Sequence, residues 1–229
     1  MDNISVLIYS CDKYSDIWGP FFTLFFRYWE CPYQVYLATE SEQCLLPNIK
    51  TINTEGETWT ERIRAAVEQI PTDYVIGMCE DFFFRRPVKQ YIIDSCLTHI
   101  KRFQNIACFN FEKDYDGAYS SGLFSCFGKK PRGNNFQKSC QPTLWRKSIL
   151  LELLDCKMDP WQWEESDTTG RYDFYIYTGH PEGVAFDYGY KHGSWFGIRK
   201  GKWVIEDVGP LFEKEGINID LSQRGVYKE

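Results

Sequence analysis

The chain has 229 residues, enough for one large domain or two small ones, and its 43% hydrophobic and 25% charged residues are typical of a soluble globular protein. Its net charge of −6 and lack of a basic block argue against a nucleic-acid partner, because phosphate contacts need clustered Lys and Arg. The nine scattered cysteines form no C-x-x-C pair, which indicates free thiols in a reducing compartment. No signal peptide or membrane span is recognisable, so we expect a cytoplasmic protein.

The first half of the chain alternates between strand and helix patterns. Its clearest helix begins at Thr58, which forms a capping-box pattern with Glu61, and ends at Pro71. Another helix precedes it, with aromatic residues at helical spacing, and a third is expected over 88–103. Strands are expected at 4–10, 33–40, 48–53, 74–79 and 105–111. This order predicts an α/β fold with a mostly parallel central sheet and helices on both faces.

The second half is less regular. Residues 120–140 are expected to form short strands and loops, and 142–154 a helix. A short helix should open at Asp159 as N-cap with Pro160 in its first position. After residue 172 the pattern favours strands and a hairpin at 197–206.

Polar side chains follow three of the predicted strands. They are Ser10 with Asp12, Thr39 with Glu40, and Glu80 with Asp81. Ligands of open α/β sheets bind outside the carboxyl ends of the parallel strands, so these side chains should share one rim. Paired acids there suit a divalent cation carrying a diphosphate. Alternatively, Glu80 and Asp81 pair with Arg85 or Arg86 or cap the next helix, and Asp12 caps the segment after the first strand.

The stretch TERIRAAVEQIPTDYVIGMCEDFFF resembles the part of GT-A fold glycosyltransferases in which an Arg-bearing helix leads into the strand of the D-x-D motif. The segments QPTLWRKSILLELL and DPWQWEE resemble the acceptor side of bacterial members that build capsular and other surface polysaccharides. The resemblance implies one nucleotide-diphospho-sugar transferase-like domain over 1–229. Residues 1–111 would bind the nucleotide sugar, and 112–229 would form the acceptor side.

The resemblance also implies roles for individual residues on the donor side. The donor would lie across Ser10, Asp12, Glu40, Arg62, Glu80 and Asp81. Asp81, with a late histidine such as His192, would hold a divalent cation, Mn²⁺ or Mg²⁺. Cys79 departs from a D-x-D motif ending at Asp81, which leaves the need for metal open. Arg62 could equally be a solvated helix residue.

On the acceptor side, Trp145, Trp161 and Trp163 are candidate sugar-stacking residues, because flat indoles match the C–H faces of sugars. Core packing is the alternative for each. Helix geometry allows only one of Glu164 and Glu165 to line a cleft, and the resemblance favours Glu164 as the general base of an inverting transfer. Both could instead be acids that complement the helix dipole.

These observations predict a glycosyltransferase that moves a sugar from a nucleotide-diphosphate donor to a hydroxyl of a growing surface polysaccharide or lipid-linked oligosaccharide. A lipid-linked acceptor would bring the protein to the inner face of the membrane, although no anchor is evident. The alternative from another class is a GT-A-like binding or scaffold module without catalysis. A nucleotidyltransferase ranks third, because no Gly-rich loop follows the first strand.

Overall fold

The computed structural model describes residues 3–113, 121–124, 126–131, 136–168, 170–179, 183–188 and 197–228. The predicted late histidine ligand, His192, lies outside these residues, as does His180. The strands are β1 (Ile4–Tyr9), β2 (Gln34–Thr39), β3 (Ile49–Asn53), β4 (Tyr74–Cys79), β5 (Ile106–Lys113), β6 (Ser121–Phe124), β7 (Phe127–Lys129), β8 (Thr143–Arg146), β9 (Asp173–Tyr177), β10 (Ile198–Arg199) and β11 (Lys202–Trp203). The helices are α1 (Ser15–Tyr28), α2 (Trp59–Gln69), α3 (Gln90–Arg102), α4 (Lys147–Leu153), α5 (Pro160–Glu165) and α6 (Ile205–Glu215), with a 3-10 turn at Asp12–Tyr14.

A nine-stranded sheet in the order β3-β2-β1-β4-β8-β5-β9-β7-β6 forms the centre of the molecule. β3, β2, β1 and β4 pair in parallel, and β9 pairs in parallel with β5. Following the pairings across this sheet, β7 and β8 run antiparallel to the other seven strands that the structure describes in it. The expected α/β fold with a mostly parallel central sheet is therefore confirmed.

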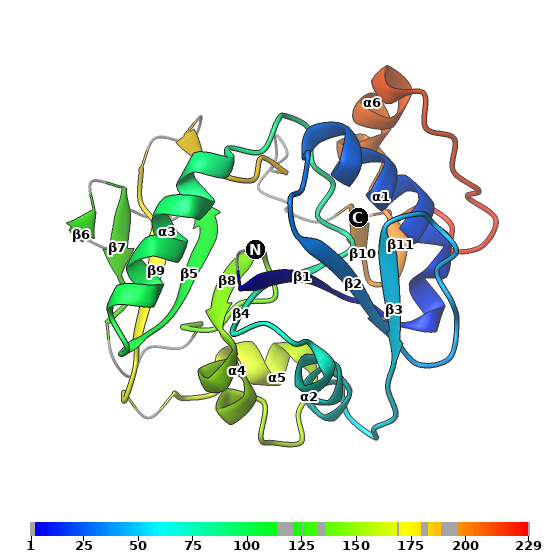
Figure 1. Ribbon diagram of the computed structural model, residues 1–229. Coiled ribbons are helices and arrows are strands. Elements are labelled where there is room, and N and C mark those ends of the chain that lie inside the picture. Colours follow the sequence, from blue (N-terminus) through cyan, green and yellow to red (C-terminus); the bar gives the residue numbers. More distant parts are fainter. Residues whose placement is uncertain are drawn as a thin grey trace.

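Helices cover both faces of the sheet, as predicted (Figure 1). One core packs α1, α3 and α6 against the side chains of β1 that include Val6 and Ile8. The other core packs α2, α4 and α5 against the opposite face, where Leu7 and Tyr9 point. Neighbouring residues of β1 thus enter different cores, which is why this strand is apolar apart from the buried Ser5.

The expected helix over 142–154 is wrong in its first third. Residues 143–146 form β8, which lies antiparallel between β4 and β5, and helix α4 begins only at Lys147. All residues of β8 are buried. A short apolar run does not distinguish a buried strand from a buried helical turn, and here pairing on both sides decides for the strand.

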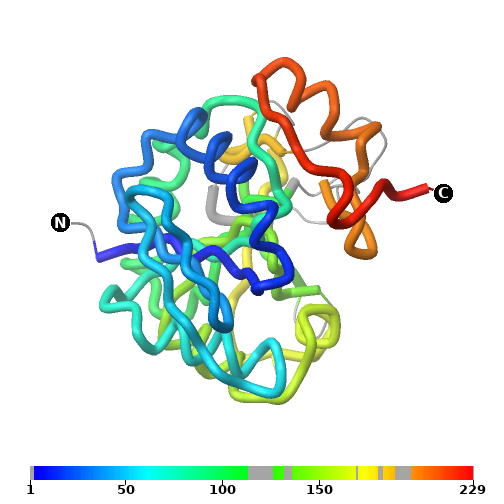
Figure 2. The backbone as a smooth tube through the Cα atoms, turned by 90° about the vertical axis from the view of Figure 1, so that its right-hand side faces the viewer, coloured from blue at the N-terminus to red at the C-terminus, as the bar shows by residue number. Residues whose placement is uncertain are grey.

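The phenylalanines after β4 attach the C-terminal part of the chain to the sheet. Phe83 stacks on Trp203 of β11 with ring centroids 6.0 Å apart, and it meets Phe212 of α6 edge-on at 5.1 Å. Phe84 packs on Phe25 of α1 at 5.6 Å. Figure 2 shows the C-terminal segment, orange to red, near the blue N-terminal helix. Part of the aromatic excess in the composition therefore fixes the last segment against the end of β4.

Helix α6 is absent from the sequence-based expectation, which had strands and a hairpin after residue 172. Gly209 and Pro210 lie inside this helix and read as breakers in the sequence. Burial of Val208, Leu211 and Phe212 against the core outweighs their cost. The predicted hairpin at 197–206 is present as the two-stranded ribbon β10–β11.

Candidate functional site

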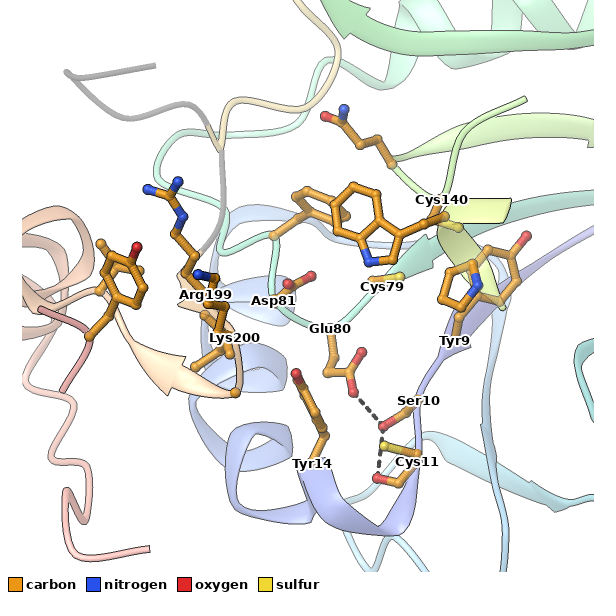
Figure 3. A pocket seen from close by; sticks show the side chains of 18 of the residues that line it. Tyr9, Ser10, Cys11, Tyr14, Cys79, Glu80, Asp81, Cys140, Arg199 and Lys200 are labelled. Carbon is orange, nitrogen blue, oxygen red and sulfur yellow. Dashed lines mark hydrogen bonds between the residues drawn. The ribbon is translucent and has the colours of Figure 1, made fainter. Parts of the chain in front are cut away.

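A cavity of about 1420 Å³ opens at the carboxyl ends of β1 and β4. Its walls come from six parts of the chain. They are the end of β1 with the following turn, the first part of α2, the end of β4, helix α5 with Cys140 and Gln141, the β10–β11 ribbon with the start of α6, and the C-terminal tail. This is the rim at which the sequence predicts a ligand site. Figure 3 shows the side chains around it, with Glu80 and Asp81 between Ser10 on one side and Arg199 on the other.

Glu80 and Asp81 both line the cavity although they are adjacent in sequence. Neighbouring strand residues point to opposite faces, but β4 ends at Cys79 and the chain turns at Glu80 and Asp81. The turn lets both carboxylates face one space. Arg85 and Arg86 do not pair with them, since both arginines pair with Asp187. The alternative that these arginines neutralise the acids is therefore wrong.

Glu80 is buried and held by one hydroxyl. Ser10 Oγ donates to Glu80 Oε1 at 2.7 Å, and Trp18 Nε1 donates to Ser10 Oγ at 2.7 Å. Burial, together with the neighbouring Asp81 charge, raises the pKa of Glu80 to about 8. Ser10 itself lines the cavity, as predicted, and its hydrogen bond orients the Glu80 carboxylate.

Asp81 is left with an unused acceptor. Its Oδ1 is buried and has no hydrogen-bond partner among the described residues. Burial raises the pKa of Asp81 to about 7. An orphaned carboxylate oxygen next to a second buried acid is poised for a proton donor or a cation from a ligand.

Asp12, which follows β1, and the polar residues at the end of β2 form hydrogen bonds with one another. The Asp12 carboxylate accepts hydrogen bonds from Thr39 Oγ1 at 2.6 Å, Ser41 Oγ at 2.6 Å and the Glu42 amide at 3.0 Å. Burial alone would raise the pKa of Asp12, but these hydrogen bonds outweigh it and hold the pKa well below its usual range. Asp12 does not line the cavity.

Glu40 joins Asp12 to the predicted phosphate-binding arginine. Its Oε2 accepts the Asp12 amide at 2.6 Å, and its Oε1 pairs with Arg62 at 2.5 Å. Arg62 lines the cavity, whereas Glu40 does not. The guanidinium at the predicted diphosphate position is thus already neutralised by a carboxylate of the protein.

Helix α5 presents two of the predicted acceptor-side residues to the cavity. Trp161 and Glu164, three residues apart, both line it, and Trp161 is 61% exposed. Glu164 Oε1 accepts the Cys140 amide at 2.5 Å, and burial raises the pKa of this carboxyl. Glu165 is exposed and lies outside the cavity. One acid of the pair lines the cleft, as helix geometry requires.

The other two predicted stacking residues are core residues in this structure. Trp145 lies in β8 and Trp163 on the inner side of α5, and both are completely buried. Their rings lie 5.9 Å apart, and Trp163 Nε1 donates to the Leu153 carbonyl at 2.9 Å. Neither lines the cavity, so of the three indoles only Trp161 reaches it.

A predicted divalent-cation site is tested by the chemistry of its donors. Among the described residues no group of three or more His, Cys, Asp or Glu side chains is arranged to hold a metal ion. The neighbouring Cys140 thiol and burial raise the pKa of Cys79 well above its usual value, so Cys79 is a neutral thiol and does not replace an acid. The orphaned Asp81 oxygen beside Glu80 still fits a Mg²⁺-type ion that takes its remaining ligands from phosphate and water.

Several cavity residues have no place in the sequence-based expectation. They are Tyr14, Cys140, Gln141, Arg199, Lys200, Tyr227 and Lys228. The ribbon carrying Arg199 and Lys200 is predictable, but its return to the end of β4 depends on contacts far apart in sequence. The triplet Arg199-Lys200-Gly201 is the one local signal, because it puts two cations at a hairpin tip.

Comparison with known proteins gives no family model and no curated protein that matches this chain. Among solved structures, it is similar to the bifunctional IspDF from Campylobacter jejuni, with 11% identity, a TM-score of 0.46, and 80% of this chain and 51% of that chain covered. S. aureus TarS 1-349 matches with 11% identity, a TM-score of 0.47, and 81% and 59% of the two chains covered. The chain thus spans between half and three-fifths of these two structures.

A third similar structure is 2-C-methyl-D-erythritol 4-phosphate cytidylyltransferase from Thermus thermophilus. It has 13% identity and a TM-score of 0.46, with 82% and 93% of the two chains covered. At these values the likenesses assign no function, and the fold stated above comes from the strand order of this chain. In the described ranges no helix is long and apolar enough to cross a membrane.

Proposed function

We propose that the protein is a glycosyltransferase that moves a sugar from a nucleotide-diphosphate donor to an acceptor hydroxyl. The observation that carries the proposal is that Glu164 lines the same cavity as Glu80 and Asp81. A displacement at a sugar carbon needs a stabilised leaving group on one side and a base on the other. The strand-end acids mark the leaving-group side, and Glu164 marks the acceptor side.

Glu164 has the environment of a general base. Burial raises its pKa, which makes the carboxylate a better proton acceptor than an exposed one. The Cys140 amide fixes one of its oxygens, so the side chain is oriented before a substrate arrives. An acceptor hydroxyl hydrogen-bonded to the carboxylate would lose its proton to Glu164 as it attacks, with inversion at the sugar carbon.

Trp161 completes the acceptor side. It is exposed at the cavity edge, one helical turn before Glu164. A sugar ring stacked on this indole would bring a hydroxyl toward the carboxylate. The acceptor class we propose is a saccharide, free or lipid-linked, of a bacterial surface polysaccharide. A lipid-linked acceptor would hold the protein at the inner membrane face.

Glu80 and Asp81 would hold a divalent cation if the reaction uses one. Such an ion would neutralise charge on the departing nucleoside diphosphate. Ser10 would keep Glu80 oriented toward it, as it does in the structure. The donor would extend from these acids along the rim toward Arg62.

The proposal is tested by a screen of nucleotide sugars. Thermal shift with and without Mn²⁺ identifies the donor, since a ligand at a hundredfold excess over Kd stabilises the native state by about 2.7 kcal/mol. The stabilising donor is then incubated with the protein, and the release of nucleoside diphosphate is measured. Without an acceptor, we expect the wild type to release nucleoside diphosphate slowly. The double variant Glu80→Gln/Asp81→Asn should release none. Binding without any release, with a range of acceptor saccharides present, would favour the binding-module alternative instead.

A further inference from the structure

Three cationic side chains of the C-terminal part of the chain line the cavity, and Figure 3 shows two of them, Arg199 and Lys200, on the side away from Ser10. The three are Arg199 and Lys200 at the tip of the β10–β11 ribbon and Lys228 in the C-terminal tail. In the part of the chain that the structure describes, no carboxylate forms an ion pair with any of them. Arg62, by contrast, is paired with Glu40 at 2.5 Å. The cations available to an anionic ligand are therefore on the ribbon and the tail.

The ribbon turn carries a lysine where turn geometry does not favour one. Lys200 has φ +50° and Gly201 has φ +75°, and these two residues connect β10 to β11. Two-residue hairpin turns with both φ values positive prefer Asn-Gly or Asp-Gly, because a side chain with a Cβ and no local hydrogen bond is disfavoured there. The turn explains Gly201 but not Lys200. A role for the ammonium group at the cavity explains it.

The ribbon is fixed to the strand end that carries the acids. The Gly197 amide donates to the Asp81 carbonyl at 3.2 Å, and the Val204 amide donates to the Gly197 carbonyl at 2.9 Å. A Cβ on Gly197 would overlap the Phe83 ring, so only glycine allows this close approach. The distance between the cationic tip and the carboxylates is thus set by packing at the base of the ribbon.

Arg224 fixes the tail beside the ribbon. Its guanidinium donates to the Gly201 carbonyl at 3.1 Å and to the Lys13 carbonyl at 2.9 Å, and it pairs with Asp16 of α1. After Arg224, the tail joins β11 through two backbone hydrogen bonds, at 3.1 and 2.8 Å. The Tyr227 ring then lies 5.0 Å from the Arg199 guanidinium, which places Lys228 beside the ribbon tip. Arg224 is a positioning residue for the ribbon and the tail.

We infer that Arg199, Lys200 and Lys228 form an anion-binding wall, and that its ligand is the diphosphate group of a nucleoside diphosphate. The identity of the ligand rests on the proposed function. A diphosphate concentrates its negative charge in a small group, and Arg and Lys are the side chains that recognise phosphate oxygens. Glu206 and Asp207 also line the cavity, at the start of α6.

In this inference the diphosphate leaving group is bound by the ribbon and the tail rather than by Arg62. Cations on the ribbon would stabilise the charge that develops on the departing diphosphate, as a metal ion does in many transferases. These side chains would therefore stabilise the leaving group although Glu80 and Asp81 are the only two carboxylates proposed to hold a metal ion. The wall and a cation held by Glu80 and Asp81 are compatible, because they would use different residues of the same cavity.

The inference is tested by titrating inorganic pyrophosphate into the protein by calorimetry, once with EDTA and once with Mg²⁺. The variants are Lys200→Asn and Arg199→Gln, with Lys202→Gln as control, because Lys202 is an exposed cation of the same ribbon outside the cavity. Lys200→Asn should keep or raise the melting temperature, since asparagine suits the turn, and it should weaken pyrophosphate binding about tenfold. Arg199→Gln should weaken binding by a similar factor.

Lys202→Gln should leave the pyrophosphate Kd within about twofold of wild type, a change expected of a screened surface charge. Absence of pyrophosphate binding in both buffers overturns the inference, as does binding that neither cavity variant weakens. Equal weakening by Lys202→Gln also overturns it, since the effect would then be long-range charge alone. Pyrophosphate binding that depends on Lys200, without release of nucleoside diphosphate from any sugar nucleotide, would refute the proposed function and leave the wall standing.

Discussion

The ends of β2 and β4 carry similar acids and treat them differently. At the end of β2, Thr39 and the following turn donate several hydrogen bonds to the carboxylate of Asp12, which follows β1, and Glu40 is paired with Arg62. At the end of β4, Glu80 has one serine hydroxyl and Asp81 Oδ1 has no partner among the described residues. The first set builds the rim. The second set is incomplete without a ligand, and it is the one that faces the cavity.

This difference separates residues that look alike in the sequence. Both sets follow apolar parallel strands, and strand position alone ranks them equally as ligand residues. The number of hydrogen bonds that the protein itself supplies to each carboxylate distinguishes them, because a buried acceptor left unpaired costs about 1–3 kcal/mol. A group that carries this cost is a candidate for function, whereas a satisfied group is explained by the fold.

The largest expected effect comes from Glu164, the acid that α5 contributes to the cavity. Glu164→Gln should lower the rate of sugar transfer about 10²- to 10⁴-fold, the usual contribution of a general base, while donor affinity holds. Gln can still accept the Cys140 amide, so the fold should be unchanged. Glu165→Gln is the matched control, exposed on the same helix, and should change the rate little. Rates are compared at saturating donor and acceptor. Equal activity of Glu164→Gln and wild type would move the base elsewhere.

The second effect is a dependence of stability on pH. The folded-state pKa of Glu80, about 8, lies above its unfolded value of 4.5. Its contribution to stability is therefore complete below about pH 4.5 and is lost as the pH rises through 8. Glu80→Gln should remove a fall of about 4 kcal/mol in the free energy of unfolding between pH 5 and 9, at about 1.4 kcal/mol for each pKa unit. Urea unfolding at several pH values measures this. If the free energy of unfolding of the wild type fell no more steeply with pH than that of Glu80→Gln, Glu80 would have a charge partner that keeps its pKa from rising.

A smaller effect is expected at the satisfied end of β2. Asp12→Ala should lower the free energy of unfolding at pH 7 by about 1–2 kcal/mol, because it removes the acceptor for the turn after β2. Since the folded-state pKa of Asp12 is lowered, this difference should shrink as the pH falls below 4. Thermal unfolding at pH 7 and pH 3 gives both numbers. An unchanged melting temperature at pH 7 would argue that Asp12 serves a ligand rather than the fold.

Much of the fold follows from local pattern. The helix from Trp59 has the predicted capping box of Thr58 and Glu61, and α5 has Asp159 as N-cap and Pro160 in its first turn. These signals lie within a few residues of one another, so a single sequence reveals them. Strand β8 and helix α6 were missed because tertiary burial decided them, against an apparent helical pattern in one case and against Gly209 and Pro210 in the other.

The candidate site shows the same limit. Strand ends and helix periodicity make Ser10, Glu80, Asp81 and Glu164 candidates, and all four line the cavity. Trp145 and Trp163 were assigned to the acceptor site, but they fill the core, since an indole has the same sequence signal in either place. The cationic wall was missed because the ribbon and tail reach the cavity through Gly197 and Arg224, contacts that join residues more than 100 positions apart. The roles of all these residues remain predictions.

The central claim is that ligand binding lies with the acids that the protein leaves unpaired. Calorimetric titration of the stabilising nucleotide sugar, with Mn²⁺, into wild type, Asp81→Asn and Asp12→Ala tests it directly. The account predicts that Asp81→Asn weakens donor binding about tenfold or more, because the amide loses the charge that a cation needs. Asp12→Ala, at a temperature where it is fully folded, should keep the Kd within about threefold of wild type. Loss of donor affinity in Asp12→Ala with full affinity in Asp81→Asn would contradict the account.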